Sequence, residues 1–233
     1  MATIALNLQA ARTTIEAAAS AACRNPQEIR LLAVSKTFPA AAIREAFAAG
    51  QRAFAESYVQ EALPKLAELS DLPLEWHYIG PLQSNKTRPI AERFAWVHSV
   101  DRFNLAQRLS AQRPADLPPL QLCLQVNVSG ESSKSGVNPD EVAALAASVV
   151  GLPKVRLRGL MAIPAPSDDP AQQRAAFTQL ADLQQQLQHA GYALDTLSMG
   201  MSHDFPAAIA AGATIVRIGT AIFGNRTYPK EST

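Results

Sequence analysis

Short apolar runs alternate with longer helical stretches along almost the whole chain, and this alternation limits the folds that it can adopt. The apolar runs predict eight strands: Ile29–Val34, Ala53–Glu56, Glu75–Ile79, Trp96–Ser99, Leu120–Val126, Val155–Met161, Thr196–Met199 and Thr214–Ile218. The stretches between them predict seven helices: Ala40–Ala49, Val59–Ser70, Lys86–Phe94, Arg102–Gln112, Pro139–Val150, Pro170–Ala190 and Asp204–Ala211. A leading helix is expected within about residues 1–25. This order predicts an α/β fold, a single (β/α)8 TIM barrel over about residues 29–224.

An open, doubly wound parallel sheet is the alternative fold for such an alternation. That fold usually carries a glycine-rich turn after its first strand, whereas this chain has Ser-Lys-Thr-Phe-Pro at residues 35–39. The length of 233 residues is close to that of a single barrel. No change in composition marks a linker, so residues 1–233 are expected to form one domain with a short C-terminal tail.

The composition argues against several classes of function. The formal net charge is +1 without a long basic run, so neither nucleic-acid binding nor attachment to an acidic membrane has electrostatic support. Cys23 and Cys123 are far apart, and the four histidines lack metal-ligand spacing, which argues against a disulfide scaffold and a metal site. No signal peptide or membrane span is visible. We expect a cytoplasmic protein, and a monomer.

Lys36 closes the first apolar run and precedes a Thr-Phe-Pro turn, so it is expected at the carboxyl end of the first strand. Parallel barrels carry their chemistry at that end. An amine held among apolar neighbours tends to lose its proton, and a neutral amine can condense with an aldehyde. The alternative is a strand-end lysine that extends into solvent.

Two segments late in the chain suit the binding of a phosphate. Barrels often bind phosphate with the loops after their seventh and eighth strands. Here Ser198-Met199-Gly200-Met201-Ser202 follows the seventh strand, and Gly219-Thr220 follows the eighth. Small residues let backbone amides approach an anion closely. The alternative is that these glycines only form tight turns.

Arg217 lies two residues before Gly219, so both are expected on one face of the eighth strand. Closure of the barrel would bring this strand beside the first one, and Arg217 toward Lys36. The arginine could also be a salt-bridged structural residue. A lysine, a phosphate site and a nearby guanidinium together suggest a ligand with an aldehyde at one end and a phosphate at the other. Pyridoxal 5′-phosphate (PLP) has that structure.

The chain resembles the pyridoxal phosphate homeostasis proteins, a single-barrel family related in fold to the N-terminal domain of alanine racemases. The resemblance covers nearly all of residues 31–224. Its motifs are AVSKT around Lys36, ESYVQE at 56–61, WHYIGPLQSNK at 76–86, VHSVD at 97–101, VNVSGESSKSG at 126–136, GLMAIP at 159–164, LSMGMS at 197–202 and VRIGTAIFG at 216–224.

The resemblance implies a role for each candidate residue. Lys36 would form the Schiff base with PLP, and Arg217 would face the pyridine nitrogen. The phosphate would be held by Ser198, Met199, Gly200, Ser202, Gly219 and Thr220. A guanidinium beside the ring nitrogen disfavours protonation of that nitrogen, which weakens the ring as an electron sink.

The resemblance therefore implies a protein that buffers or delivers PLP and turns over no substrate of its own. Apo forms of PLP enzymes would be transient recipients. Racemases of related fold use a tyrosine from a second domain, and this chain is expected to lack that domain because it ends soon after Gly224. Two alternatives stay open: a weak PLP-dependent racemase, and an aldolase-type barrel in which Lys36 traps a sugar phosphate.

Several residues depart from the family pattern or compete with these assignments. Ser57 stands where the family usually has Asn, and His203 where an acidic residue is common, with Asp204 as a partial replacement. Lys86 and Lys134 are other amines, which are expected to be solvated or to pass PLP onward. The remaining expectations concern His77 as a satisfied barrel histidine, Cys123 as an inert thiol, and Asp168-Asp169 as a helix start.

Overall fold

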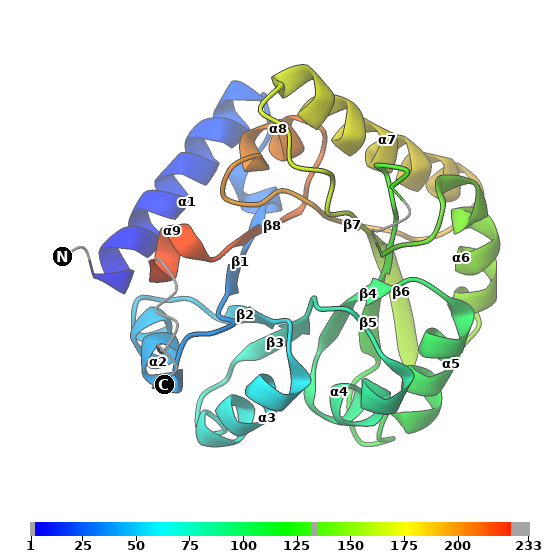
Figure 1. Ribbon diagram of the computed structural model, residues 1–233, viewed down its shortest axis with the longest axis horizontal. Helices are drawn as coiled ribbons and strands as arrows, with labels where there is room; N and C mark the ends of the chain where they lie inside the picture. The colour runs from blue at the N-terminus through cyan, green and yellow to red at the C-terminus, as the bar shows by residue number, and fades with distance from the viewer. Residues whose placement is uncertain (1–2, 132–134, 225–233) are drawn as a thin grey trace, which may run out of the picture.

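Eight parallel strands form a closed barrel in the order of the sequence (Figure 1). The computed structural model describes residues 3–131 and 135–224. The strands are β1 Arg30–Val34, β2 Ala53–Glu56, β3 Glu75–Tyr78, β4 Trp96–Val100, β5 Leu120–Gln125, β6 Val155–Met161, β7 Thr196–Ser198 and β8 Ile215–Ile218. β8 pairs with β1, which closes the barrel. The predicted TIM barrel is confirmed.

Helices form a ring around the barrel (Figure 1). They are α1 Ile4–Ala21, α2 Ala40–Ala48, α3 Val59–Glu68, α4 Thr87–Arg93, α5 Phe103–Gln112, α6 Val142–Val150, α7 Pro170–His189, α8 Phe205–Ala210 and α9 Thr220–Phe223, with 3-10 turns at Pro26–Glu28, Ser84–Lys86 and Pro139–Glu141. The predicted strands and helices are all present. Their predicted ends differ mostly by one or two residues, and only the short α9 was not predicted as a helix.

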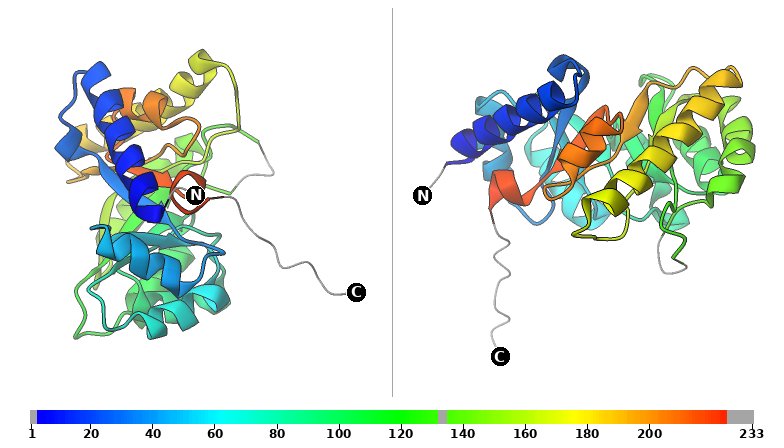
Figure 2. Two further views of the ribbon diagram at one scale, coloured as in Figure 1. Left: turned by 90° about the vertical axis from the view of Figure 1, so that its left-hand side faces the viewer. Right: turned by 90° about the horizontal axis from the view of Figure 1, so that it is seen from above.

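The leading helix α1 covers the seam where the barrel closes. It packs against α2, α8 and α9 (Figures 1 and 2). Leu8, Ile15 and Ala19 recur at helical spacing and are buried, which gives α1 one apolar face. The side-chain amide of Asn7 donates to the carbonyl oxygen of Ile222 at 2.9 Å, so α1 also fixes α9 beside the end of β8.

The barrel interior contains polar as well as apolar side chains. Two small apolar groups lie inside the sheet, one around Leu32 and Ile215 and one around Trp96 and Cys123, while the large core lies between strands and helices. His77, His98, Ser198 and Arg217 are also buried on the strands. Burial of polar groups is costly unless they are hydrogen-bonded, so these four must have partners.

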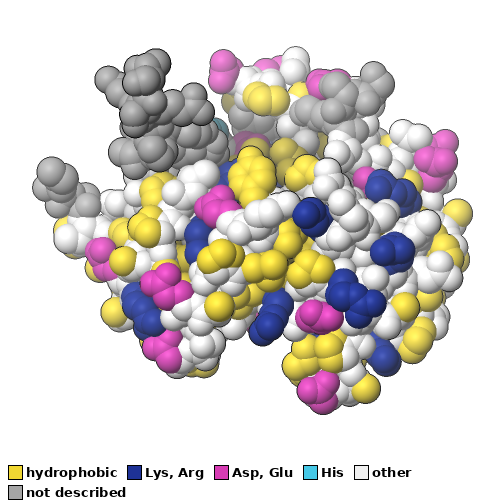
Figure 3. All heavy atoms as spheres, turned by 60° about the horizontal axis from the view of Figure 1, so that its bottom comes forward, with side chains coloured by type: hydrophobic (Ala, Val, Ile, Leu, Met, Phe, Trp, Pro, Cys, Tyr) yellow, Lys and Arg dark blue, Asp and Glu magenta, His cyan; other side chains and the backbone are white. Residues whose placement is uncertain are grey.

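The outer surface carries charges of both signs. On the face shown in Figure 3, Lys and Arg side chains are interspersed with Asp, Glu, apolar and uncharged ones. Within residues 3–131 and 135–224, none of the helices combines the length and the hydropathy that crossing a membrane requires.

Gly159 on β6 provides a test of how closely the neighbouring strand β7 and the helix α7 approach this strand. A Cβ atom there would lie 1.8 Å from the carbonyl oxygen of Thr196 and 2.7 Å from Oε1 of Gln184. We expect Gly159→Ala to lower the free energy of unfolding by about 3 kcal/mol, because backbone and helix must move apart. Urea denaturation followed by circular dichroism measures this loss.

Gly151→Ala is the matched control. A Cβ at Gly151 would meet nothing within 4 Å, and the residue has an ordinary φ of −84°. We expect its effect to stay within about 0.5 kcal/mol. Equal losses for the two variants would contradict the close packing of β6.

Candidate functional site

A pocket of about 410 Å³ lies at the carboxyl end of the barrel strands. It is lined by Val34, Lys36, Ser57, Tyr58, Ile79, Gly80, Pro81, Ile163, Met201, Ser202, His203, Arg217, Gly219 and Thr220. These residues come from the ends of β1, β2, β3, β6, β7 and β8 and from the start of α9. We call it the Lys36 pocket. Its volume is in the range of small-molecule sites.

The structure brings five of the predicted site residues together in this pocket: Lys36, Ser202, Arg217, Gly219 and Thr220. The β1–β8 pairing explains the arrangement, because Leu32 stands opposite Arg217 and Ala33 opposite Ile218. The loop that contains Lys36 therefore leaves the sheet beside the loop that contains Gly219 and Thr220.

The other three predicted residues lie behind the pocket and not in its lining. Ser198 and Met199 are fully buried. Gly200 has a φ of +89°, and a Cβ there would lie 2.6 Å from Cβ of Ala208 on α8. Its carbonyl oxygen accepts the backbone N–H of Arg217 at 3.0 Å. These residues thus join β7 to α8 and β8 beneath the loop that carries Ser202.

Arg217 is held by neutral oxygen atoms. Its Nη1 donates to the carbonyl oxygen of Ser198 at 2.6 Å and to Oγ of Ser198 at 2.9 Å, and its Nη2 donates to the carbonyl oxygen of Ala162 at 2.9 Å. Burial lowers the pKa of the guanidinium to about 10, so it stays charged at neutral pH. These bonds use three of its five N–H groups. The remaining two make no hydrogen bond to the residues that the structure describes.

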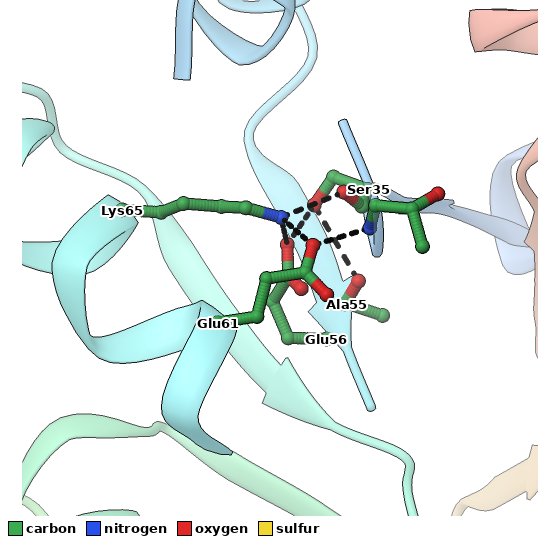
Figure 4. Close-up of polar contacts among 6 residues, drawn as sticks. Ser35, Ala55, Glu56, Glu61 and Lys65 are labelled. Atoms are coloured by element: carbon green, nitrogen blue, oxygen red, sulfur yellow. Dashed lines mark hydrogen bonds and ion pairs between the residues drawn. The ribbon is translucent and has the colours of Figure 1, made fainter. Parts of the chain in front are cut away.

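Hydrogen bonds hold the backbone on both sides of Lys36 (Figure 4). Nζ of Lys65 donates to the carbonyl oxygen of Ser35 at 3.0 Å, and the N–H of Thr37 donates to Oε1 of Glu61. Thr37 has a φ of +70°, a conformation that costs a non-glycine residue about 1 kcal/mol. The bond from Thr37 to Glu61 helps to maintain this conformation, which sets the direction in which the chain leaves Lys36.

Glu56 and Glu61 share the Lys65 ammonium, which lies 3.1 Å from Oε1 of Glu56 and 2.7 Å from Oε1 of Glu61. Glu56 is fully buried and also accepts the hydroxyl of Ser35 at 2.7 Å. Burial raises the pKa of Glu56, and the Lys65 charge opposes that rise. We call Ser35, Thr37, Glu56, Glu61 and Lys65 the Lys65 cluster. The cluster fixes the end of β1 from the side of α3.

Close contacts fix the other walls of the pocket. A Cβ on Gly80 would lie 1.9 Å from the carbonyl oxygen of Ser57, so the turns after β2 and β3 touch there. The rings of Phe38 and Phe223 stack with centroids 5.1 Å apart, which links the loop after Lys36 to α9.

Large apolar side chains form part of the rim of the pocket. Tyr58, Ile163 and Met201 line it and are 53%, 38% and 37% exposed. The mouth therefore combines exposed apolar surface with polar groups deeper inside.

The two departures from the family pattern both lie at this pocket. Ser57 is buried in its lining, and His203 is exposed at its rim. Oδ1 of Asp204 accepts the N–H of Met201 at 2.6 Å. Asp204 therefore stabilises the turn before α8, and its side chain does not bond the first N–H groups of that helix.

The structure also answers the remaining expectations. His77 bonds Glu75 and His98 with its two ring nitrogens and is the satisfied barrel histidine that was predicted. Cys123 is fully buried, and burial raises its pKa to about 12, which agrees with the expectation of an inert thiol. Asp169 accepts the N–H of Ala171 at 2.9 Å and caps α7. Lys86 lies outside the pocket lining, and Lys134 lies outside the described residues.

The described residues contain no group of three or more His, Cys, Asp or Glu side chains placed to hold a metal ion. A larger hollow of about 1,020 Å³ lies along α7, but α7 and Asp169 alone supply its lining. It is a groove on one helix, without groups converging from other elements.

Comparison with known proteins identifies the family. Residues 6–227 match the family model described as alanine racemase, N-terminal domain. The chain is 64% identical over 228 residues to the pyridoxal phosphate homeostasis protein of Pseudomonas aeruginosa, with 98% of each chain covered. It is 54% identical to that of Escherichia coli K12, covering 98% of this chain and 99% of the other. The chain belongs to the pyridoxal phosphate homeostasis protein family. The resemblance drawn from the motifs is thus confirmed.

A solved structure resembles the chain over nearly its whole length. PipY of Synechococcus elongatus, solved with PLP bound, is 42% identical with a TM-score of 0.84, covering 95% of this chain and 100% of that one. The alanine racemase of Corynebacterium glutamicum is only 16% identical, with a TM-score of 0.71, covering 95% of this chain and 61% of that one. That second likeness shows a shared barrel fold.

Lys65→Met tests the Lys65 cluster. The substitution keeps most of the side-chain volume but leaves a buried carboxylate and a backbone carbonyl without their cation. We expect the free energy of unfolding at pH 7 to fall by about 3 kcal/mol, because removal of one partner leaves the other charge buried and unpaired. Urea denaturation measures the change.

Lys86→Met is the control for the same chemical change. Among the described residues, the Lys86 side chain makes no hydrogen bond or ion pair, and we expect a loss within about 0.5 kcal/mol. If Lys65→Met were as stable as Lys86→Met, the cluster would not hold the end of β1.

Proposed function

We propose that this protein binds PLP as a Schiff base on Lys36 and buffers or delivers the cofactor without turning over a substrate of its own. The amine nitrogen of Lys36 attacks the aldehyde carbon, a C=N bond replaces the C=O bond, and one water molecule leaves. The observation that carries this proposal is the convergence of Lys36 and Arg217 in one pocket of a chain from a family with a PLP-bound member.

The pocket has unused hydrogen-bond donors where a phosphate would be expected. The hydroxyls of Ser202 and Thr220 make no hydrogen bond to any other residue that the structure describes. Gly219 has no side chain between its backbone and the pocket. These three residues would hold the phosphate from the loops after β7 and β8, the usual phosphate position in such barrels. Met199 and Gly200 would support that loop from behind.

Arg217 would face the pyridine nitrogen with its two remaining N–H groups. A guanidinium that already carries a charge only donates, so it disfavours a proton on that nitrogen. PLP supplies an electron sink for carbanion chemistry when its ring nitrogen is protonated. Arg217 would therefore damp that chemistry, which suits a protein that holds the cofactor. The relatives from Pseudomonas and Escherichia are likewise named for homeostasis and not for a reaction.

The proposed function also has implications for where the protein acts and which proteins receive the cofactor. We propose that the protein works as a cytoplasmic monomer and that apo forms of PLP enzymes receive the cofactor from it transiently. The exposed rim formed by Tyr58, Ile163 and Met201 leaves the mouth of the pocket accessible to such a recipient within the described part of the chain.

Lys36→Ala tests the proposal directly. We expect the purified protein to become yellow with PLP, and borohydride reduction to fix the cofactor on Lys36. Lys36→Ala should lose both the absorption band and the covalent label, whereas Lys86→Ala, which removes an amine outside the pocket, should retain them. A wild-type protein that stays colourless after incubation with PLP would end the proposal.

Solvent exchange of the α-hydrogen of amino acids separates a carrier from a weak racemase. We expect α-deuterated alanine to keep its label when it is incubated with the PLP-loaded protein. Loss of the label at more than about 1 per second, the lower end of usual enzyme turnover, would favour an enzyme. Trapping of a sugar phosphate on Lys36 without any chromophore would instead favour an aldolase.

A further inference from the structure

A line of hydrogen bonds crosses the interior of the barrel from β3 to β8. Oε1 of Glu75 lies 2.6 Å from Nε2 of His77, and Nδ1 of His77 lies 2.9 Å from Nε2 of His98. Nδ1 of His98 lies 2.8 Å from Oγ of Ser198, which accepts Nη1 of Arg217 at 2.9 Å. Both histidines and Ser198 are fully buried. We call these five residues the Glu75–Arg217 chain.

With both imidazole rings neutral, the two ends of the Glu75–Arg217 chain agree with one arrangement of the hydrogen atoms. Arg217 can only donate, so Oγ of Ser198 accepts from it, and the Ser198 hydroxyl can donate its own hydrogen to Nδ1 of a neutral His98. That leaves the His98 hydrogen on Nε2, where it is donated to Nδ1 of His77. The His77 hydrogen is then on Nε2 and is donated to Glu75. Starting from the carboxylate, which can only accept, gives the same arrangement.

The carboxylate end is also fixed by an ion pair with Arg30. Nη1 of Arg30 lies 2.7 Å from Oε1 of Glu75. The bonds to His77 and Arg30 overcome the effect of burial and lower the pKa of Glu75 to about 2, so the side chain is ionised at neutral pH. Glu75 and Arg30 line a hollow separate from the Lys36 pocket. The Glu75–Arg217 chain therefore begins at that separate hollow and ends at Arg217, in the lining of the Lys36 pocket.

A charged His77 would reverse the hydrogen bond from His98 to His77 and the one from Ser198 to His98. If His77 carried two hydrogens, its Nδ1–H would face Nε2 of His98, and the His98 hydrogen would have to move to Nδ1. Oγ of Ser198 would then face two donors, and its own hydrogen would lose its acceptor in the chain. Burial is the main cause that lowers the pKa of both rings, which agrees with two neutral histidines.

We propose that Glu75, His77, His98 and Ser198 are positioning residues that fix the guanidinium of Arg217 for the cofactor. Arg217 makes no ion pair with a carboxylate in residues 3–131 and 135–224, so its hydrogen bonds to neutral acceptors set its orientation, and Asp204 adds only a charge interaction without a hydrogen bond. The Glu75–Arg217 chain keeps a lone pair of Ser198 Oγ directed at Nη1 of Arg217. The N–H groups of Arg217 that make no hydrogen bond would then serve a ligand in the Lys36 pocket. This inference rests on the proposed function, and it assigns Ser198 an effect through Arg217 and not through its own contact with phosphate.

The positions of the hydrogens can be measured without any cofactor. Two-bond ¹H–¹⁵N correlation spectra of the ligand-free protein at neutral pH should show both buried rings neutral, with the hydrogen on Nε2. A hydrogen on Nδ1 of either ring, or a doubly protonated ring, would overturn the proposal. This measurement needs no variant and is independent of PLP.

Ser198→Ala removes one link, and Ser99→Ala is its matched control. Ser99 is also buried on a barrel strand, next to His98, but its hydroxyl has no hydrogen-bond partner in the described part of the chain. Ser198→Ala should shift the Nδ1 resonance of His98, while Ser99→Ala should leave it in place. Ser198→Thr restores a hydroxyl and should return the resonance toward the wild-type position.

The same three variants test the effect on the cofactor. We expect Ser198→Ala to weaken PLP binding roughly two- to tenfold and to shift the absorption maximum of the bound cofactor, because one hydrogen bond to Arg217 is lost. Ser99→Ala should match the wild type, and Ser198→Thr should recover most of the loss. An unchanged affinity and spectrum in a folded Ser198→Ala would overturn the positioning role.

These outcomes separate the inference from the proposed function. If the wild type binds no PLP, the proposed function fails and the positioning role fails with it, although the predicted tautomers can still be observed. If the wild type binds PLP on Lys36 while Ser198→Ala behaves like Ser99→Ala, only the positioning role fails. If Ser198→Ala does not fold, the tautomers of His77 and His98 in the wild-type protein still decide whether the Glu75–Arg217 chain of hydrogen bonds exists.

Discussion

The pairing of β8 with β1 is the contact on which the site depends. It places Leu32 opposite Arg217, so that Lys36 and Thr220, which lie near opposite ends of the chain, emerge at one edge of the sheet. No local interaction could bring them together. The helix α1 lies over this seam, packed on α2, α8 and α9, and thereby protects it from the solvent. The long-range closure therefore brings the pocket residues together, and α1 lies over the seam on the outside of the barrel (Figures 1 and 2).

Two buried polar networks support the walls of the pocket, and they follow the same physical rule. A polar group away from water is tolerated when it has a partner of the right type. In the Lys65 cluster, one ammonium satisfies a carbonyl and two carboxylates; in the Glu75–Arg217 chain, each acceptor faces one donor. The first network holds the backbone at Lys36, and the second holds Arg217. An exception is Oε2 of Glu56, which is buried without a partner.

The fold and much of the site could be predicted from the sequence because both depend on local patterns. Strands appear as short apolar runs, and Lys36, Arg217 and Gly219 are recognisable from their positions at strand ends. The Lys65 cluster was missed, although Glu61 and Lys65 have the i, i+4 spacing of a helical ion pair. The link from His98 to Ser198 could not have been found this way, because its register across the barrel depends on the shape of the whole sheet.

Ser198 shows the same difference between a local sequence pattern and a contact across the barrel. From sequence, a serine at the end of β7 belongs to a small-residue segment and is naturally assigned to the phosphate. In the structure its hydroxyl points into the barrel toward His98 and Arg217. A pattern of small residues thus identifies the loop, but side-chain direction decides whether a residue contacts a ligand or orients a neighbour. A site with rigid polar groups below and an exposed apolar rim would bind a cofactor in a defined pose and still allow it to leave.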